Sequence, residues 1–157
     1  GIDPDIRIAV NGTPIPADDK YGIPLRIFEG TLNNITEENM HKFYFRMFGD
    51  KKTNELNKEM VPKRTLKSLH DELRWLYNRM MEQTDSGFRW DYALTSEIDR
   101  VFPYENVNNY WAKEKNTKHI ILPVPHYFFN NWKSFAEFID FVENYGKKRV
   151  TKQKKVS

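Results

Sequence analysis

The sequence predicts an α+β fold, in which a small antiparallel or mixed sheet of about three strands packs against four or five helices. Three segments have the alternation or the β-favouring content of strands, and others have apolar residues at helical spacing. At 157 residues the chain is long enough for one domain with a buried core. We expect a single globular domain over residues 5–146, and we interpret residues 1–4 as the remnant of a purification tag.

Two of the expected strands lie near the start of the chain and one lies later. Apolar residues alternate with residues of the opposite face over 5–10, and residues 23–29 are rich in β-favouring types. The segment between them holds two glycines and two prolines and is too long for a two-residue turn, so we predict a wide hairpin. Residues 118–124 form the third expected strand, which prolines bound.

Three helices have clear start or periodicity signals. Thr36, followed by two glutamates, is typical of a helix start, and Gly49 is a typical helix end. Five apolar residues step by three and four over residues 65–83, which places them on one helical face. The last helix opens with the capping-box pattern that begins at Ser134, and it ends at Gly146. The polar stretch between the first two helices is expected to be a loop or a short frayed helix.

Two shorter helical patterns cover about 94–102 and 105–115, with Pro103 and Tyr104 between them. They can be drawn as a helix-turn-helix whose second helix turns asparagine and lysine side chains outward. Asparagine is the side chain that pairs with adenine through two hydrogen bonds in the major groove. The pattern therefore predicts a helix that could read DNA.

Charge is distributed unevenly along the chain. Residues 147–157 hold six of the 25 basic residues and no acid, so the rest of the chain carries 19 basic residues against 22 acids. We expect these last residues to form a disordered basic tail. The segment 41–80 holds ten basic residues and five acids, which makes it the one locally basic part of an acidic body. If segment and tail converge, they form a phosphate-binding face.

The sequence thus favours a small, non-enzymatic nucleic-acid-binding protein without a cofactor. Its contacts are expected from the basic segment, the second short helix and the tail: Lys51, Lys52, Lys63, Arg64, Lys67, Asn106, Asn109, Lys113, Lys115, Lys147, Lys148 and Arg149.

An alternative function is a protein-interaction adaptor or a homodimer. The segment 126–141 contains seven aromatic residues, more than one helical face can bury. Aromatic side chains left on a surface suit a protein interface. Phe128, Phe129 and Trp132 are the expected interface residues.

Several chemistries are set aside or kept as weaker alternatives. The chain has no cysteine, which excludes thiolate sites and favours an intracellular location, and no apolar run is long enough to cross a membrane. No glycine-rich phosphate loop is present, Ser-His-acid catalysis has no elbow motif, and the four histidines do not have metal-site spacing. The dipeptide at 70–71 is found in metal-dependent phosphohydrolases, but no further ligands accompany it. If the protein is an enzyme, we expect a metal-dependent phosphohydrolase or a metal-dependent nuclease, the nuclease using Asp91, Glu97 and Asp99.

Overall fold

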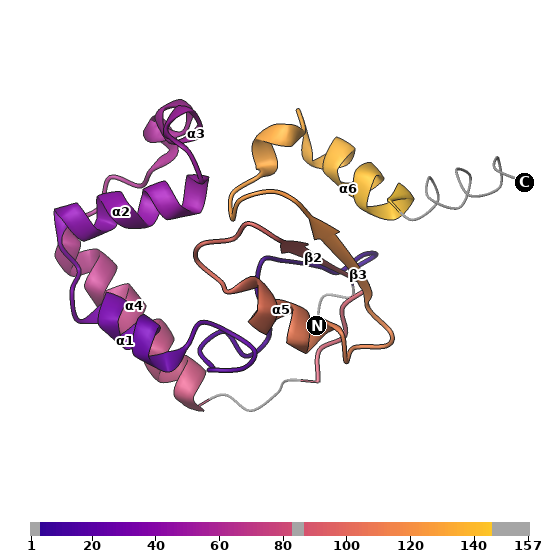
Figure 1. Cartoon of the computed structure of the whole chain (residues 1–157), viewed down its shortest axis with the longest axis horizontal. Helices are drawn as coiled ribbons and strands as arrows, with labels where there is room; N and C mark the ends of the chain where they lie inside the picture. Colours follow the sequence, from indigo (N-terminus) through magenta and orange to yellow (C-terminus); the bar gives the residue numbers. More distant parts are fainter. Residues whose placement is uncertain (1–3, 83–86, 146–157) are drawn as a thin grey trace, which may run out of the picture. The chain divides into compact units, whose positions relative to one another are not determined.

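The computed structural model describes residues 4–82 and 87–145. The helices and strands in chain order are β1 (Ile8–Val10), α1 (Leu25–Leu32), α2 (Glu37–Phe48), α3 (Lys51–Leu56), the 3₁₀ helix η1 (Lys58–Met60), α4 (Leu66–Glu82), β2 (Tyr92–Ser96), α5 (Tyr104–Trp111), β3 (Lys118–Leu122), the 3₁₀ helix η2 (Phe129–Asn131) and α6 (Phe135–Asn144) (Figure 1). The chain divides into two compact units between His126 and Tyr127. The first unit contains the sheet and helices α1 to α5, and the second contains η2 and α6.

The three strands form one parallel sheet in the order β1-β2-β3. Ile8 pairs with Tyr92, and Tyr92 pairs with Lys118 on its other side. Parallel neighbours need a crossover connection, and here α1 to α4 lie between β1 and β2 while α5 lies between β2 and β3. The predicted hairpin and the predicted antiparallel or mixed sheet are therefore wrong.

Strand β2 is the centre of the sheet and of the core. Its last four residues, Ala93 to Ser96, are all buried. Ala93 packs in one cluster with Ala9 of β1 and with Val107 and Trp111 of α5. A strand covered on both faces shows no alternation of polar and apolar residues, which explains why the sequence pattern at 94–102 suggested a helix. The predicted helix-turn-helix is wrong, because its first half is this strand and the loop that follows it.

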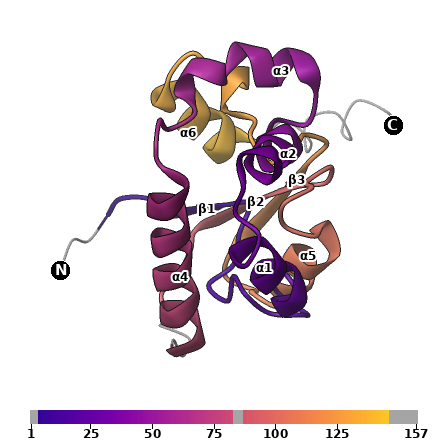
Figure 2. The same cartoon turned by 90° about the vertical axis from the view of Figure 1, so that its left-hand side faces the viewer.

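Helices α1 and α4 lie against each other in the first unit (Figures 1 and 2). The rings of Phe28 and Tyr77 stack at 5.7 Å, and the Tyr77 hydroxyl donates to Glu29 at 2.6 Å. The predicted strand over 23–29 is wrong: Pro24 precedes the first turn of a helix that buries Phe28 and Leu32, four residues apart on one face.

Helix α2 confirms the predicted start and end. The Thr36 hydroxyl accepts a hydrogen bond from the backbone N–H of Asn39 at 3.2 Å, and Gly49 ends the helix with a φ of 85°. This φ favours glycine because a side chain is strained there. Helix α2 is thus held at both ends, and it carries side chains that line the cavities described below.

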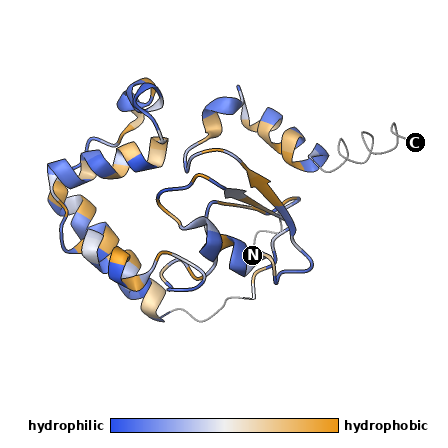
Figure 3. Cartoon of the chain, in the orientation of Figure 1, coloured by the Kyte–Doolittle hydropathy of each residue, from blue (hydrophilic) through white to orange (hydrophobic). Residues whose placement is uncertain are grey.

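The second unit begins at Tyr127 and contains the last predicted helix. The Ser134 hydroxyl accepts from the N–H of Glu137 at 3.2 Å, which confirms the predicted start of α6, but the Glu137 carboxylate accepts from the N–H of Lys133 at 2.8 Å and not from that of Ser134. The predicted end of this helix at Gly146 lies outside the described residues. Figure 3 shows β3 in hydrophobic colours, whereas α2, α3 and α4 mix hydrophilic and hydrophobic residues. In the part of the chain that the structure describes, no helix combines the length and the apolar character needed to cross a membrane. The single domain over 5–146 stays a prediction, and the basic tail lies outside the described residues.

Candidate functional site

Two polar side chains meet at the carboxyl edge of the parallel sheet. Asp99 comes three residues after the end of β2, and His126 comes four residues after the end of β3. Because parallel strands end at the same edge, the loops after them are neighbours. The His126 Nδ1 atom lies 2.8 Å from the Asp99 Oδ2 atom.

The Asp99 carboxylate is buried and fully engaged. Its Oδ1 atom accepts hydrogen bonds from the backbone N–H groups of Val101 at 2.6 Å and Phe102 at 2.9 Å, and Oδ2 faces His126. The Asp99 side chain is 3% exposed, against 23% for the His126 side chain. The acid is therefore fixed inside the loop, and the imidazole extends from it toward the surface.

The His126 ring is oriented from two directions. Asp99 holds the Nδ1 atom, and the ring of Phe102 stacks on the imidazole at 6.2 Å with an angle of 5° between the planes. Within residues 4–82 and 87–145, Nε2 has no hydrogen-bond partner. An imidazole held in this way keeps Nε2 for accepting and donating a proton.

His126 lines a cavity of about 410 Å³. The walls come mainly from apolar side chains on α1, α2, α4 and the loop after β2, among them Phe28, Phe43, Leu73 and Leu76. Arg46 and Arg100 also line it. The cavity thus combines a proton-transfer group with a space that suits an aliphatic chain.

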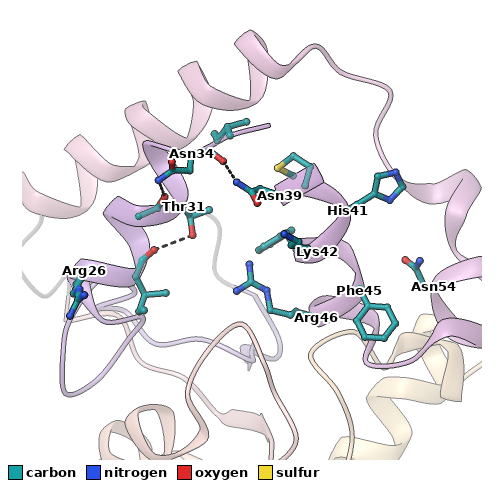
Figure 4. Close-up of a pocket in the computed structure, with 14 residues that line it drawn as sticks. Arg26, Thr31, Asn34, Asn39, His41, Lys42, Phe45, Arg46 and Asn54 are labelled. Atoms are coloured by element: carbon teal, nitrogen blue, oxygen red, sulfur yellow. Dashed lines mark hydrogen bonds between the residues drawn. The ribbon is translucent and has the colours of Figure 1, made fainter. Parts of the chain in front are cut away.

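A second cavity, of about 840 Å³, lies along α1 and α2 (Figure 4). Arg26, Lys42 and Arg46 line it, and Arg46 is shared with the first cavity. Lys42 is paired with Glu38 at 2.6 Å, whereas the guanidinium groups of Arg26 and Arg46 form no ion pair within the described residues. We call this cationic cavity the α1–α2 groove.

The three acids predicted for a nuclease are not brought together. Asp91 precedes β2 and accepts from the N–H of Arg7 at 2.7 Å, whereas Asp99 follows the other end of β2. Glu97 directly follows the strand, and its backbone N–H donates to the carbonyl of Leu122 at 2.8 Å. No group of three histidines or acids in the described residues could hold a metal ion.

The basic residues predicted to contact nucleic acid lie on several elements. Lys51 and Lys52 lie on α3, Lys63 precedes α4, and two further cations are paired with acids of α4: Arg64 with Glu72, and Lys67 with Asp71 at 2.5 Å. Pairing of this kind reduces the charge that a phosphate would meet.

The residues predicted for a DNA-reading helix are partly engaged within the protein. Asn106 donates to the carbonyls of Asp19 and Gly22, at 3.0 and 2.8 Å, and the Lys113 ammonium lies 3.8 Å from the centre of the Tyr21 ring. Asn109 is exposed on α5, and Lys115 lies beyond that helix. Lys147, Lys148 and Arg149 lie outside the described residues.

The aromatic residues predicted for an interface pack on one another within the second unit. Phe128 is 3% exposed and stacks on Phe129 at 5.3 Å, and Trp132 meets Phe138 edge to face at 5.0 Å. Phe128 is therefore not a surface residue, and its ring forms part of a local core.

The sequence pattern did not single out His126, and it offered Asp99 only as a candidate nuclease acid. The available pattern was an acid shortly after one buried strand and a histidine shortly after the next. This pattern requires residues 92–96 to form a strand, because a helix there would place Asp99 elsewhere.

Comparisons with known proteins point to one family. The family described as pimeloyl-ACP methyl esterase BioG matches residues 1–138. A malonyl-[acyl-carrier protein] O-methyltransferase from Bacteroides fragilis is 41% identical over 109 residues, which are 69% of this chain and 22% of that protein. An uncharacterised protein from Haemophilus influenzae is 35% identical over 133 residues, covering 84% of this chain and 60% of that protein.

The crystal structure of BioG from Haemophilus influenzae has the same fold. It superposes with a TM-score of 0.79 at 33% identity, over 87% of this chain and 63% of that chain. The present chain thus spans less than two thirds of the length of these relatives.

These findings overturn the predicted nucleic-acid-binding function. Neither a nucleic-acid partner nor a DNA-binding helix-turn-helix has support from the relatives, and the adaptor and nuclease alternatives have none either. The match to one family model extends over most of the chain. The chain belongs to the family of the pimeloyl-ACP methyl esterase BioG.

Proposed function

We propose that the protein hydrolyses the methyl ester of a carrier-bound acyl chain, with Asp99 and His126 as two members of a Ser-His-Asp triad. The observation that carries the proposal is the 2.8 Å contact between Asp99 and His126, beside an apolar cavity. The family supports it, since its description names a methyl esterase that acts on pimeloyl-ACP.

The roles of the two residues follow from their positions. His126 Nε2 takes the proton from the nucleophile as it attacks the ester carbonyl, and it then gives that proton to the departing methanol. Asp99 keeps the proton of His126 on Nδ1 and stabilises the imidazolium that forms. A water molecule, activated in the same way, then releases the acid from the acyl-enzyme.

The nucleophile is proposed to come from outside these 157 residues. No serine lines the His126 cavity in the described part of the chain. In enzymes of the α/β-hydrolase fold the triad follows the chain order serine, acid, histidine. Asp99 and His126 have the order of the last two, and the relatives are longer than this chain.

The acyl chain is proposed to occupy the His126 cavity. A pimeloyl group has five methylenes between its two carbonyl carbons, and burying a methylene contributes about 0.8 kcal/mol. Complete burial would contribute about 4 kcal/mol before the costs of ordering. Phe28, Phe43, Leu73 and Leu76 supply the apolar walls for it.

The α1–α2 groove is proposed to receive an anionic part of the carrier. A substrate attached to a protein needs a docking surface next to the cavity that holds its acyl chain, and the groove shares Arg46 with that cavity. Exposed cations increase the association rate with an anionic partner, especially at low salt. The intracellular location predicted from the absence of cysteine is kept as part of this proposal.

Hydrolysis of pimeloyl-ACP methyl ester tests the proposal. It is measured on the natural-length protein, by which we mean a chain that contains these 157 residues together with the additional length found in the relatives. The substitutions His126→Ala and Asp99→Asn should lower kcat by about 10³- to 10⁴-fold, because each disables the proton transfer. Glu97→Gln is the matched control, since it removes an acid from the same loop without touching His126. A His126→Ala or Asp99→Asn variant that keeps the wild-type rate would contradict the proposed function.

A further inference from the structure

Asn11 has an unusual backbone conformation next to the site. It directly follows β1, and its φ of 47° is the one positive value of a residue other than glycine in the described residues. Such a conformation costs free energy and persists only where the surrounding contacts enforce it. Asparagine tolerates it better than most residues.

Asn11 is buried, 4% exposed, and both ends of its side-chain amide are used. The Nδ2 group donates to the carbonyl of His126 at 2.5 Å, and the Oδ1 atom accepts from the backbone N–H of Ser96 at 2.8 Å. The partners fix the orientation of the amide, because only its oxygen can accept from an N–H group.

These bonds join the ends of three strands. The backbone N–H of Asn11 also donates to the carbonyl of Leu94 in β2, at 2.9 Å. Asn11 therefore links the end of β1, the end of β2 and the loop after β3 that carries His126. Asp99 and Phe102 hold the imidazole, whereas Asn11 holds the backbone from which the imidazole extends.

We propose that Asn11 is a positioning residue that sets the backbone of His126, so that the ring held by Asp99 faces the cavity. The inference rests on the proposed function for its effect on the reaction. Asn11 acts through His126 and has no contact with the reacting atoms. A displacement of about 1 Å in a catalytic group can lower a rate by about a hundredfold, so a single buried amide can matter this much.

Two substitutions separate the side chain from the backbone conformation. Asn11→Asp keeps the shape and an acceptor for Ser96, but its carboxylate cannot donate to the His126 carbonyl. Asn11→Gly adopts the positive φ without strain and removes both side-chain bonds. The matched control is Asn106→Asp, which also removes amide donation to backbone carbonyls but leaves the loop of His126 untouched.

The experiment measures kcat and KM for the methyl ester, together with the ¹⁵N signals of the histidine rings, in the natural-length protein. The His126 signal is assigned from its loss in His126→Asn. We expect Asn11→Asp and Asn11→Gly to lower kcat by about tenfold to a hundredfold with KM changed less than about twofold, and to shift the His126 signal. Asn106→Asp should change neither quantity.

Unchanged kcat and an unchanged His126 signal in both Asn11 variants would overturn the inference, and so would a loss of equal size in Asn106→Asp. If Asn11→Asp does not fold, Asn11→Gly alone decides. A wild-type protein that cleaves no methyl ester would contradict the proposed function, while the His126 signal would still decide whether Asn11 positions the ring.

Discussion

At the scale of single residues, the site depends on side chains that are far apart in the sequence and close in space. Asp99 could be named from the sequence as a candidate acid, but its contact with His126 could not, because nothing local connects residues 99 and 126. Their contact of 2.8 Å exists only because β2 and β3 are parallel neighbours. The bonds of Asn11 to Ser96 and His126 depend on the same pairing.

Another histidine gives a stability prediction at this scale. The His119 Nε2 atom lies 2.8 Å from the Thr95 hydroxyl, and burial lowers the pKa of His119 below its ordinary value of 6.5. The unfolded chain therefore binds a proton here more readily than the folded protein does. The free energy of unfolding should be unaffected by His119 above about pH 7 and should fall as the pH drops through 6.5.

Urea unfolding between pH 5.5 and pH 8 measures this effect. His119→Gln, which cannot take up a proton, should show a smaller loss of stability on acidification than the wild type. An equal loss in both proteins would show that His119 does not contribute.

At the scale of elements, the residues that cap helix ends predicted the structure more reliably than the composition of a segment did. Thr36, Gly49 and Ser134 mark helix ends in the sequence and in the structure, because capping is a local interaction between neighbouring residues. Composition failed at residues 23–29 and 94–102, where burial decides the structure. A short apolar segment can be a strand or a helix, and only its tertiary neighbours choose between them.

Helix α2 provides the prediction at this scale. Arg46→Gln should lower kcat/KM for the carrier-bound ester by up to about fivefold, because an exposed ion pair contributes about 0.2 to 1 kcal/mol. The same variant should cleave a small free methyl ester at close to the wild-type rate. A small change is allowed for, because Arg46 also lines the His126 cavity. Arg26→Gln, which alters the α1–α2 groove alone, should affect only the carrier-bound ester.

Arg79→Gln is the control for these variants, since Arg79 lies on α4 and is paired with Glu82. The carrier-dependent loss should also shrink at high salt, as expected for exposed charges. If Arg26→Gln and Arg79→Gln give the same kcat/KM, the groove does not receive the carrier.

At the scale of the whole molecule, the family membership and the site support each other. The chain matches a methyl esterase family over residues 1–138, and the region matched contains both Asp99 and His126. The charge distribution that suggested nucleic acid was a property of composition, and it could not distinguish one anionic partner from another. The relatives are longer than this chain, and we propose that the remaining triad member lies in that additional length.

Labelling with a serine-directed phosphonate, followed by mass spectrometry, tests this triad most directly in the natural-length protein. We expect one serine outside residues 1–157 to be labelled, and we expect His126→Ala and Asp99→Asn to slow the labelling by a large factor while Glu97→Gln does not. Labelling of a residue within this chain, or labelling at the wild-type rate in His126→Ala, would contradict it.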